Sequence, residues 1–177
     1  GGYAYADSLV AGLARLHPFD ISVAAYPETH PQATSAAADL DHLKRKVDAG
    51  ATRAITQFFF DNDCFKRFQD RTAGAGIHVP IVPGILPIRN FAKVAAMAAS
   101  CGTHIPTDLR VRFENLKEDE EGRRQLAFET ALEQCDNLRR VGVDHFHFYT
   151  LNQADLARDV CRELGLVPSQ GMTREST

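Results

Sequence analysis

The sequence predicts an α/β fold built on parallel strands. Four short apolar segments rich in β-branched and aromatic residues alternate with longer segments of helical periodicity. Each strand is followed by a helix, an order that makes the strands parallel and covers them on both faces. No repeat or linker interrupts the 177 residues, so we expect one domain. The order fits either a small doubly wound sheet or part of a (β/α)₈ barrel, a fold of about 250 residues.

The predicted strands are short apolar runs between turn residues. They are expected at 21–26, 55–60, 79–82 and 145–150. The third run is followed by "PGILPI", which we interpret as a turn because two prolines and a glycine interrupt it. Before the first strand, Leu9, Leu13 and Leu16 recur at helical spacing, so they predict an amphipathic helix that Pro18 ends.

The remaining helices are predicted between and after the strands. An apolar stripe over 36–47 marks the second helix, with Gly50 as its C-terminal cap. Asp61 is placed to cap a third helix that holds Phe65 and Phe68. Further helices are expected at 90–100, at 118–140 and after Asn152, with an irregular stretch at 101–108.

Composition excludes several classes of protein. The formal net charge is -3, with basic residues distributed along the chain, which argues against a dedicated nucleic-acid or membrane surface. No apolar stretch approaches the roughly 20 residues of a membrane span. The four cysteines form no CxxC pair, so we expect a reducing cytoplasm. The chain opens inside an apparent helix without an initiating Met, and we therefore expect a truncation.

One polar residue interrupts the strand "ITQFFFD". Alternation along a strand places Ile55, Gln57 and Phe59 on one face. A buried amide costs a few kcal/mol unless it is hydrogen-bonded, so Gln57 needs a partner. The sequence leaves two interpretations open: a core glutamine bonded to neighbouring backbone, or an amide that binds a ligand.

Polar and aromatic residues gather at the carboxyl ends of the predicted strands, where ligands bind in parallel α/β folds. Groups of this kind converging from several strands predict a pocket for a flat heteroaromatic ligand. They are Tyr26, Glu28, His30, Gln57, His147 and Tyr149.

Two further patterns have both a structural and a functional interpretation. The basic run "LKRK" at 43–46 is either a solvated helix face or a source of phosphate ligands, because Arg45 and Lys46 follow a loop near the candidate pocket. The chain has no GxGxxG or GxxxxGK[ST] loop. His145 and His147 have a spacing that could serve zinc, but His145 is expected at the start of its strand, away from the ligand end.

The segments "AAYPETHP", "LKRKVDAGA", "ITQFFFD", "PGILPI" and "HFYTLN" resemble bacterial methylenetetrahydrofolate reductases. The resemblance runs from "GYAYA" to about Val167, with the motifs in the family's order. It implies a (β/α)₈ barrel that binds FAD, of which residues 1–167 supply roughly strands five to eight. Residues 168–177 are expected to be a flexible tail.

The resemblance also implies roles for individual residues. It places FAD against Ala6, Tyr26, His30, Ala33, Asp39, His42, Arg45 and Lys46. Gln57 matches the glutamine that hydrogen-bonds the pterin of folate, where nicotinamide also docks, and is the one residue of the chain with an expected catalytic role. Tyr149 and Leu151 match residues that line the same pocket. Lys93 and Gln153 stand where relatives often have Gln and Arg, so the cation for the glutamate tail of folate is expected to have moved to Lys93.

The implied reaction is reduction of 5,10-methylenetetrahydrofolate to 5-methyltetrahydrofolate by NAD(P)H through FAD. The family's proton donor, a glutamate near strand one, and the aspartate that tunes the flavin from strand four have no counterpart here, and Glu28 is no replacement for either. The expected partners are folate, a nicotinamide nucleotide and a second copy of the chain, without nucleic acid or membrane. Two alternatives stay open: a non-catalytic flavin- or folate-binding fragment or remnant, and a metal-dependent barrel hydrolase.

Overall fold

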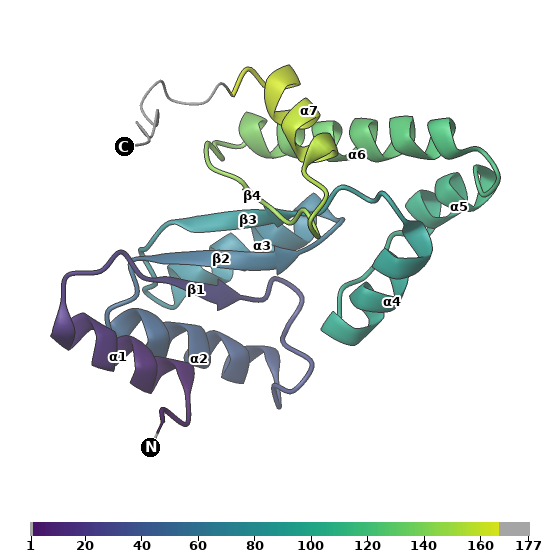
Figure 1. Ribbon diagram of the computed structural model, residues 1–177. Coiled ribbons are helices and arrows are strands. Elements are labelled where there is room, and N and C mark those ends of the chain that lie inside the picture. Colours follow the sequence, from purple (N-terminus) through teal and green to yellow (C-terminus); the bar gives the residue numbers. More distant parts are fainter. Residues whose placement is uncertain (1, 167–177) are drawn as a thin grey trace.

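A computed structural model describes residues 2–166 of the chain, which form a four-stranded parallel sheet with helices around it (Figure 1). The strands lie in chain order, each hydrogen-bonded to the next. They are β1 (Ser22–Ala25), β2 (Arg53–Phe58), β3 (Ile81–Ile85) and β4 (His147–Phe148). The helices are α1 (Ala6–Leu16), α2 (Ala36–Asp48), α3 (Asn62–Gly74), α4 (Phe91–Cys101), α5 (Thr107–Asn115), α6 (Glu120–Arg140) and α7 (Asp155–Glu163).

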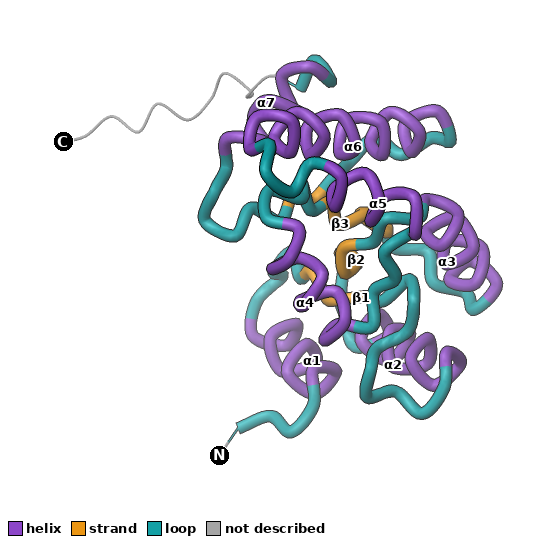
Figure 2. The backbone as a smooth tube through the Cα atoms, turned by 90° about the vertical axis from the view of Figure 1, so that its right-hand side faces the viewer, coloured by secondary structure: helices purple, strands orange, loops and turns teal. Residues whose placement is uncertain are grey.

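The helices cover the two faces of the sheet unequally. Viewed from the carboxyl ends of the strands, α2, α3 and α6 surround one face, whereas α4 crosses the other side in front of the strand ends (Figure 2). One apolar cluster joins α2 to β1 and β2, a second joins α3, α6 and α7 to β3, and a third packs α4 and α5 beyond the strand ends. The carboxyl ends therefore lie beneath a helical layer of their own.

Most predicted elements are confirmed, including the caps predicted at Gly50 and Asp61. The Asp61 carboxylate accepts a hydrogen bond of 2.9 Å from the Asp63 amide at the start of α3. Gly50, just after α2, has a φ of 117°, a conformation that favours glycine. Phe65 and Phe68 of α3 are buried, as their spacing predicts.

The prediction of a turn at 83–88 is wrong, because β3 runs from Ile81 through Ile85. The strand survives a proline because β2 bulges beside it: Ile55 is paired with Val82, and Phe58 with Gly84, so β2 has one extra residue. The hydroxyl of Thr56 accepts a hydrogen bond of 2.8 Å from the Gly84 amide. A side chain thus replaces the backbone partner that the bulge removes.

The bulge also changes which residues share a face. Phe59 is fully buried and stacks on Phe65 of α3 with ring centroids 5.2 Å apart, whereas Gln57 lies on the half-buried face of β2 with Arg53 and Ile55. The prediction that Gln57 and Phe59 share a face is therefore wrong. Helix α5 begins inside the stretch predicted to be irregular.

The apolar stripe predicted for α1 does not face the core. Leu9 and Leu16 are 42% and 77% exposed, and Val10 is the residue of this helix that enters the cluster with α2 and β1. Leu13, between these two leucines, is half-buried. None of the helices over residues 2–166 has the length and apolarity needed to cross a membrane.

Candidate functional site

Two tyrosines directly follow the two outer strands of the described sheet, Tyr26 after β1 and Tyr149 after β4. Burial raises the pKa of Tyr149, and Tyr26 and Cys101 lie close enough to raise it further. The pKa of Tyr26 is raised mainly by burial and then by Asp39 and Cys101. Both tyrosines therefore lie at the carboxyl ends of their strands, and the predicted convergence of aromatic groups stays a prediction.

The position of Tyr149 depends on the bulge in β2. Its hydroxyl donates a hydrogen bond of 3.0 Å to the Thr56 carbonyl, and its ring lies over Gly84, where a Cβ atom would be 2.6 Å from the ring. His147 lies next to it, with ring centroids 4.9 Å apart. Tyr149 thus presents its ring, and not its hydroxyl, to the surrounding space.

Gln57 lies on the open face of the sheet. Buried and half-buried residues alternate along β2, and Gln57 is half-buried, like Arg53 and Ile55. Its side-chain oxygen accepts a hydrogen bond of 3.2 Å from the Phe58 amide. Over residues 2–166 no hydrogen bond is recorded for its Nε2. The side-chain oxygen of Gln57 is therefore hydrogen-bonded, whereas its Nε2 is available as a donor within the described residues.

The residues assigned to FAD group around the loop between β1 and α2. The rings of Tyr26 and His30 meet edge to face at 4.5 Å, and the Asp39 carboxylate accepts a hydrogen bond of 2.9 Å from the His30 amide. The Ala33 amide donates to the His30 carbonyl at 2.9 Å. Tyr26, His30, Ala33 and Asp39 are therefore brought together.

The two predicted phosphate ligands on α2 already have partners. Arg45 forms an ion pair of 3.4 Å with Asp7, and Lys46 Nζ donates to the Ala24 carbonyl at 2.5 Å. Burial lowers the pKa of Lys46, against the influence of Asp39 and Asp7. Ala6, next to Asp7, begins α1 and is exposed, as is His42 on α2.

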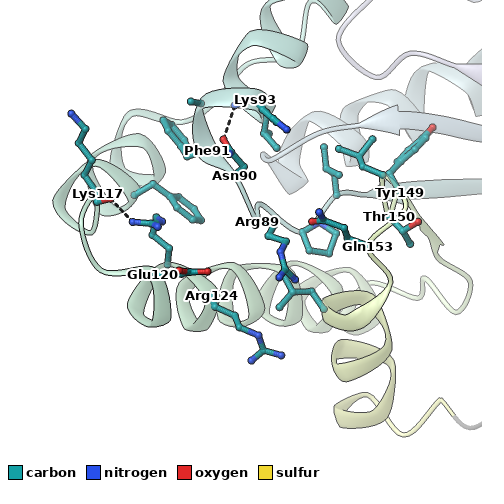
Figure 3. A pocket seen from close by; sticks show the side chains of 18 of the residues that line it. Arg89, Asn90, Phe91, Lys93, Lys117, Glu120, Arg124, Tyr149, Thr150 and Gln153 are labelled. Carbon is teal, nitrogen blue, oxygen red and sulfur yellow. Dashed lines mark hydrogen bonds between the residues drawn. The ribbon is translucent and has the colours of Figure 1, made fainter.

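A cavity of about 880 Å³ opens between the segment after β3, the helices α4, α5 and α6, and the loop after β4 (Figure 3). Four of the five residues assigned to folate line it: Lys93, Tyr149, Leu151 and Gln153. Gln57 is not among the lining residues, and the structure therefore separates it from the other four.

The outer part of this cavity is rich in charged side chains that the sequence did not single out. They are Arg89, Glu114, Lys117, Glu120, Glu121, Arg123 and Arg124. Arg89 is paired with Asp155, and Arg124 with Asp159 at 2.9 Å. The Lys93 ammonium has no recorded ion pair within residues 2–166. The only feature of the sequence that could have pointed to these charged lining residues is the high density of charge on the predicted helices.

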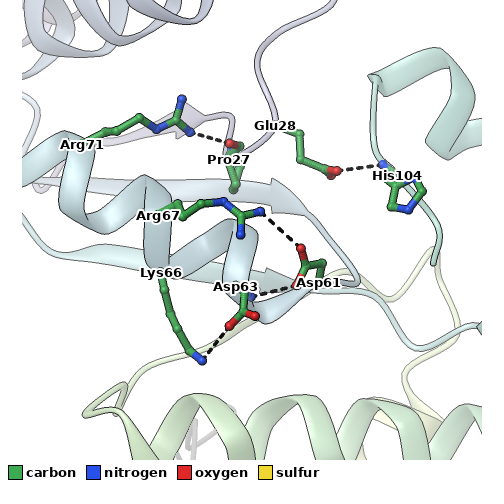
Figure 4. Close-up of polar contacts among 8 residues, drawn as sticks. All are labelled: Pro27, Glu28, Asp61, Asp63, Lys66, Arg67, Arg71 and His104. Atoms are coloured by element: carbon green, nitrogen blue, oxygen red, sulfur yellow. Dashed lines mark hydrogen bonds and ion pairs between the residues drawn. The ribbon is translucent and has the colours of Figure 1, made fainter.

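Glu28 holds loops together instead of lining the cavity (Figure 4). Its carboxylate accepts a hydrogen bond of 3.0 Å from the His104 amide, which ties the loop after β1 to the segment between α4 and α5. Arg71 of α3 donates to the Pro27 carbonyl at 2.7 Å in the same loop. Burial raises the pKa of Glu28, against the bond to His104.

His145 and His147, the two histidines considered for zinc, make different contacts in the structure. His145 is exposed and bonded to Asp144 at 2.7 Å, whereas His147 lies in β4 beside Tyr149. In the part of the chain that the structure describes, no three His, Cys, Asp or Glu side chains come close enough to hold a metal ion.

Several known proteins resemble this chain. The family model described as methylenetetrahydrofolate reductase matches residues 1–165. Proteins named 5,10-methylenetetrahydrofolate reductase from Salmonella typhimurium and Escherichia coli are 51% and 50% identical over 164 residues. These matches cover 93% of the chain but 55% of each relative, so the chain spans about half the length of the relatives it matches.

A more distant relative and a solved structure extend the comparison. The maize protein named methylenetetrahydrofolate reductase (NADH) 1 is 37% identical, covering 98% of the chain and 31% of that protein. A Clostridium thermocellum protein, titled as binding two copies of 5-methyl-5,6,7,8-tetrahydrofolic acid, superposes with a TM-score of 0.61 at 15% identity. This match covers 89% of the chain and 58% of that protein, and it shows a shared fold.

Proposed function

The chain belongs to the methylenetetrahydrofolate reductase family, and on that premise we propose that it is the C-terminal half of a flavin-dependent folate reductase. Residues 1–167 would supply strands five to eight of a (β/α)₈ barrel, since the four described strands are parallel and in chain order. The boundary at 167 and the proposed tail at 168–177 lie outside the described residues. The proposed reaction reduces 5,10-methylenetetrahydrofolate to 5-methyltetrahydrofolate with NAD(P)H.

The side chains around β1 and α2 fit an FAD. Tyr26 and His30 offer two rings, the Asp39 carboxylate accepts from the His30 amide, and Arg45 and Lys46 are cations suited to the phosphates. Bound FAD would supply the hydride-transfer chemistry. The task of these residues is to hold the cofactor at the carboxyl end of the sheet, where Ala6, Ala33 and His42 would complete its surroundings.

The folate would occupy the 880 Å³ cavity and the open face beside it. In this proposal the free Nε2 of Gln57 donates to the pterin, and the ring of Tyr149 and the side chain of Leu151 form the wall of the pocket. Lys93 supplies a cation for the glutamate carboxylates, and Gln153 lies across the cavity from it (Figure 3).

One observation carries the proposal more than any other. Lys93, Tyr149, Leu151 and Gln153 come from two segments more than 50 residues apart, yet all four line a single cavity. A cavity of this size is in the range of small-molecule sites.

Equilibrium binding of 5-methyltetrahydrofolate to the wild-type chain and to Lys93→Ala tests the proposal. We expect binding that is weakened about tenfold by the substitution, the scale of one charge-assisted hydrogen bond. Lys66→Ala is the control, because Lys66 pairs with Asp63 on α3 outside the cavity. Equal affinity of wild type and Lys93→Ala would contradict the assignment of Lys93.

A second candidate is a non-catalytic flavin- or folate-binding fragment. This candidate predicts that the 177-residue chain binds FAD weakly and reduces no folate. Normal turnover by the chain would contradict it. A bound metal ion detected in the purified protein would instead favour the hydrolase.

A further inference from the structure

The loop after β1 contains a residue in an unfavourable backbone conformation. Thr29 has a φ of 86°, in a region that favours glycine and that a β-branched residue adopts only under constraint. The next residue, His30, is one of the proposed flavin contacts, and its ring meets that of Tyr26 at 4.5 Å. Because the backbone of Thr29 sets the direction in which His30 leaves the turn, the surrounding structure must hold this loop in place.

Two side chains restrain the loop just before Thr29 (Figure 4). The Glu28 carboxylate accepts a hydrogen bond of 3.0 Å from the His104 amide. Arg71 donates to the Pro27 carbonyl at 2.7 Å. Arg71 is exposed, whereas Glu28 is half-buried. Since water competes less for a half-buried hydrogen bond than for an exposed one, Glu28 is the stronger of the two restraints.

The partner of Glu28 is itself fixed to the fold. Thr103, before His104, is buried, and its hydroxyl donates to the Phe58 carbonyl at the end of β2 at 3.2 Å. Ile105, after His104, is 7% exposed and packs in the cluster of α4 and α5. Because both neighbours of His104 are anchored, its amide is a rigid donor. The hydrogen bond therefore positions the loop after β1 and not the segment after α4.

We propose that Glu28 is a positioning residue for the flavin site: it holds Thr29 in its strained conformation and so presents the ring of His30 to the cofactor. Without this restraint the loop would relax to a more favourable φ at Thr29 and turn His30 away. The role rests on the proposed function, because it needs a flavin beside His30. The restraint on the loop, in contrast, is a property of the chain without any ligand.

Equilibrium titration of FAD into the 177-residue chain tests this role. We expect Glu28→Ala to weaken FAD binding about tenfold, the scale of one hydrogen bond to a charged group. Glu28→Gln should bind within about twofold of wild type, because an amide oxygen also accepts from the His104 amide. Asp70→Ala is the control, since Asp70 is an exposed carboxylate of α3 with no ion pair recorded within residues 2–166. Equal FAD affinity of wild type and Glu28→Ala would overturn the proposal.

A second substitution distinguishes positioning from a general loss of stability. Thr29→Gly allows a φ of 86° without a steric cost, so the loop needs less restraint. In a chain that carries Thr29→Gly, we therefore expect Glu28→Ala to weaken FAD binding less than about threefold. If Glu28 only stabilised the fold, its replacement would have the same effect in both backgrounds. That result would overturn the proposal.

Hydrogen exchange of the ligand-free chain tests the restraint even if FAD does not bind. In Glu28→Ala, the amides of His30 and Ala33 are expected to exchange about tenfold faster, although both keep their own acceptors. The Thr103 amide, bonded to a carbonyl at the end of α4, should be unchanged. Faster exchange confined to the His104 amide would overturn the proposal. Faster exchange at His30 and Ala33 in a chain that binds no FAD would support the restraint and count against the flavin site.

Discussion

Gln57 and Gln134 show how one residue type serves two purposes in the same sheet. The Gln134 amide nitrogen donates to the Phe59 carbonyl at 2.8 Å and so completes the backbone hydrogen bonding after β2. The Gln57 nitrogen has no such bond recorded in the described part of the chain. The sequence could not separate a structural amide from a ligand-binding one, because the difference depends on which backbone groups the fold leaves unpaired.

Replacing the two glutamines by leucine should have opposite consequences. Gln134→Leu leaves the Phe59 carbonyl without its donor, and we expect a loss of about 1 kcal/mol in the free energy of unfolding. Gln57→Leu should change stability by less than about 0.5 kcal/mol and weaken binding of 5-methyltetrahydrofolate severalfold. Urea unfolding and ligand titration measure the two quantities. A Gln57→Leu chain that loses stability but keeps its affinity would assign Gln57 to the structure.

Glu28 makes stability depend on pH. Its pKa is raised above the ordinary value of 4.5 because the carboxylate is half-buried, so the folded chain holds the proton more tightly than the unfolded chain. The stabilisation from protonation is present below pH 4.5 and disappears as pH rises through the folded-state value. Glu28→Gln keeps an acceptor for the His104 amide and should therefore gain stability relative to wild type at pH 7 but not at pH 4.

Thermal unfolding of both chains at the two pH values measures this difference. A gain of the same size at both values would show that ionisation of Glu28 is not its cause.

At the scale of elements, the bulge in β2 governs the site. It aligns Thr56 with the Gly84 amide and places Tyr149 over the glycine. The sequence predicted the existence of three of the four strands well because apolar runs identify them. It missed the course of β3, since Pro83 and Gly84 signal a turn unless a side chain replaces the lost backbone partner. That replacement depends on a residue nearly 30 positions away.

The glycine at position 84 should not tolerate a side chain. A Cβ atom there would meet the Thr56 carbonyl and lie 2.6 Å from the Tyr149 ring, so Gly84→Ala should lower the free energy of unfolding by about 2 kcal/mol or more. Gly74→Ala at the end of α3 is the control, because nothing lies within 4 Å of its Cβ position. We expect the control to be neutral or slightly stabilising. If urea unfolding shows equal effects of the two substitutions, the close packing of Thr56 and Tyr149 against Gly84 does not exclude a side chain there.

Helix α1 illustrates a different limit of sequence analysis. The spacing of Leu9, Leu13 and Leu16 predicted the helix correctly, but Leu9 and Leu16 are exposed. Periodicity shows that a helix has an apolar stripe and does not show what covers it. Val10, which is 4% exposed, packs in the cluster with α2 and β1 instead.

At the scale of the whole molecule, the candidate site is distributed around the carboxyl end of one sheet. The flavin-binding residues proposed here lie by β1 and α2, the folate-lining residues by β3, α4 and β4, and Gln57 lies on the strand between them. The resemblance to the family predicted which residues would take part. It did not predict the charged rim of the cavity or the hydrogen bond of Lys46 to the Ala24 carbonyl, because both depend on contacts between helices and strands.

The most direct test of the central claim uses this chain within a protein extended to the length of its relatives. We predict that the purified protein is yellow, that NADH or NADPH bleaches its flavin without oxygen, and that 5,10-methylenetetrahydrofolate then restores the colour. Gln57→Leu in the same protein should slow the second step and leave bleaching by the nucleotide possible. A colourless protein, or a reduced flavin that the folate cannot reoxidise, would contradict the account.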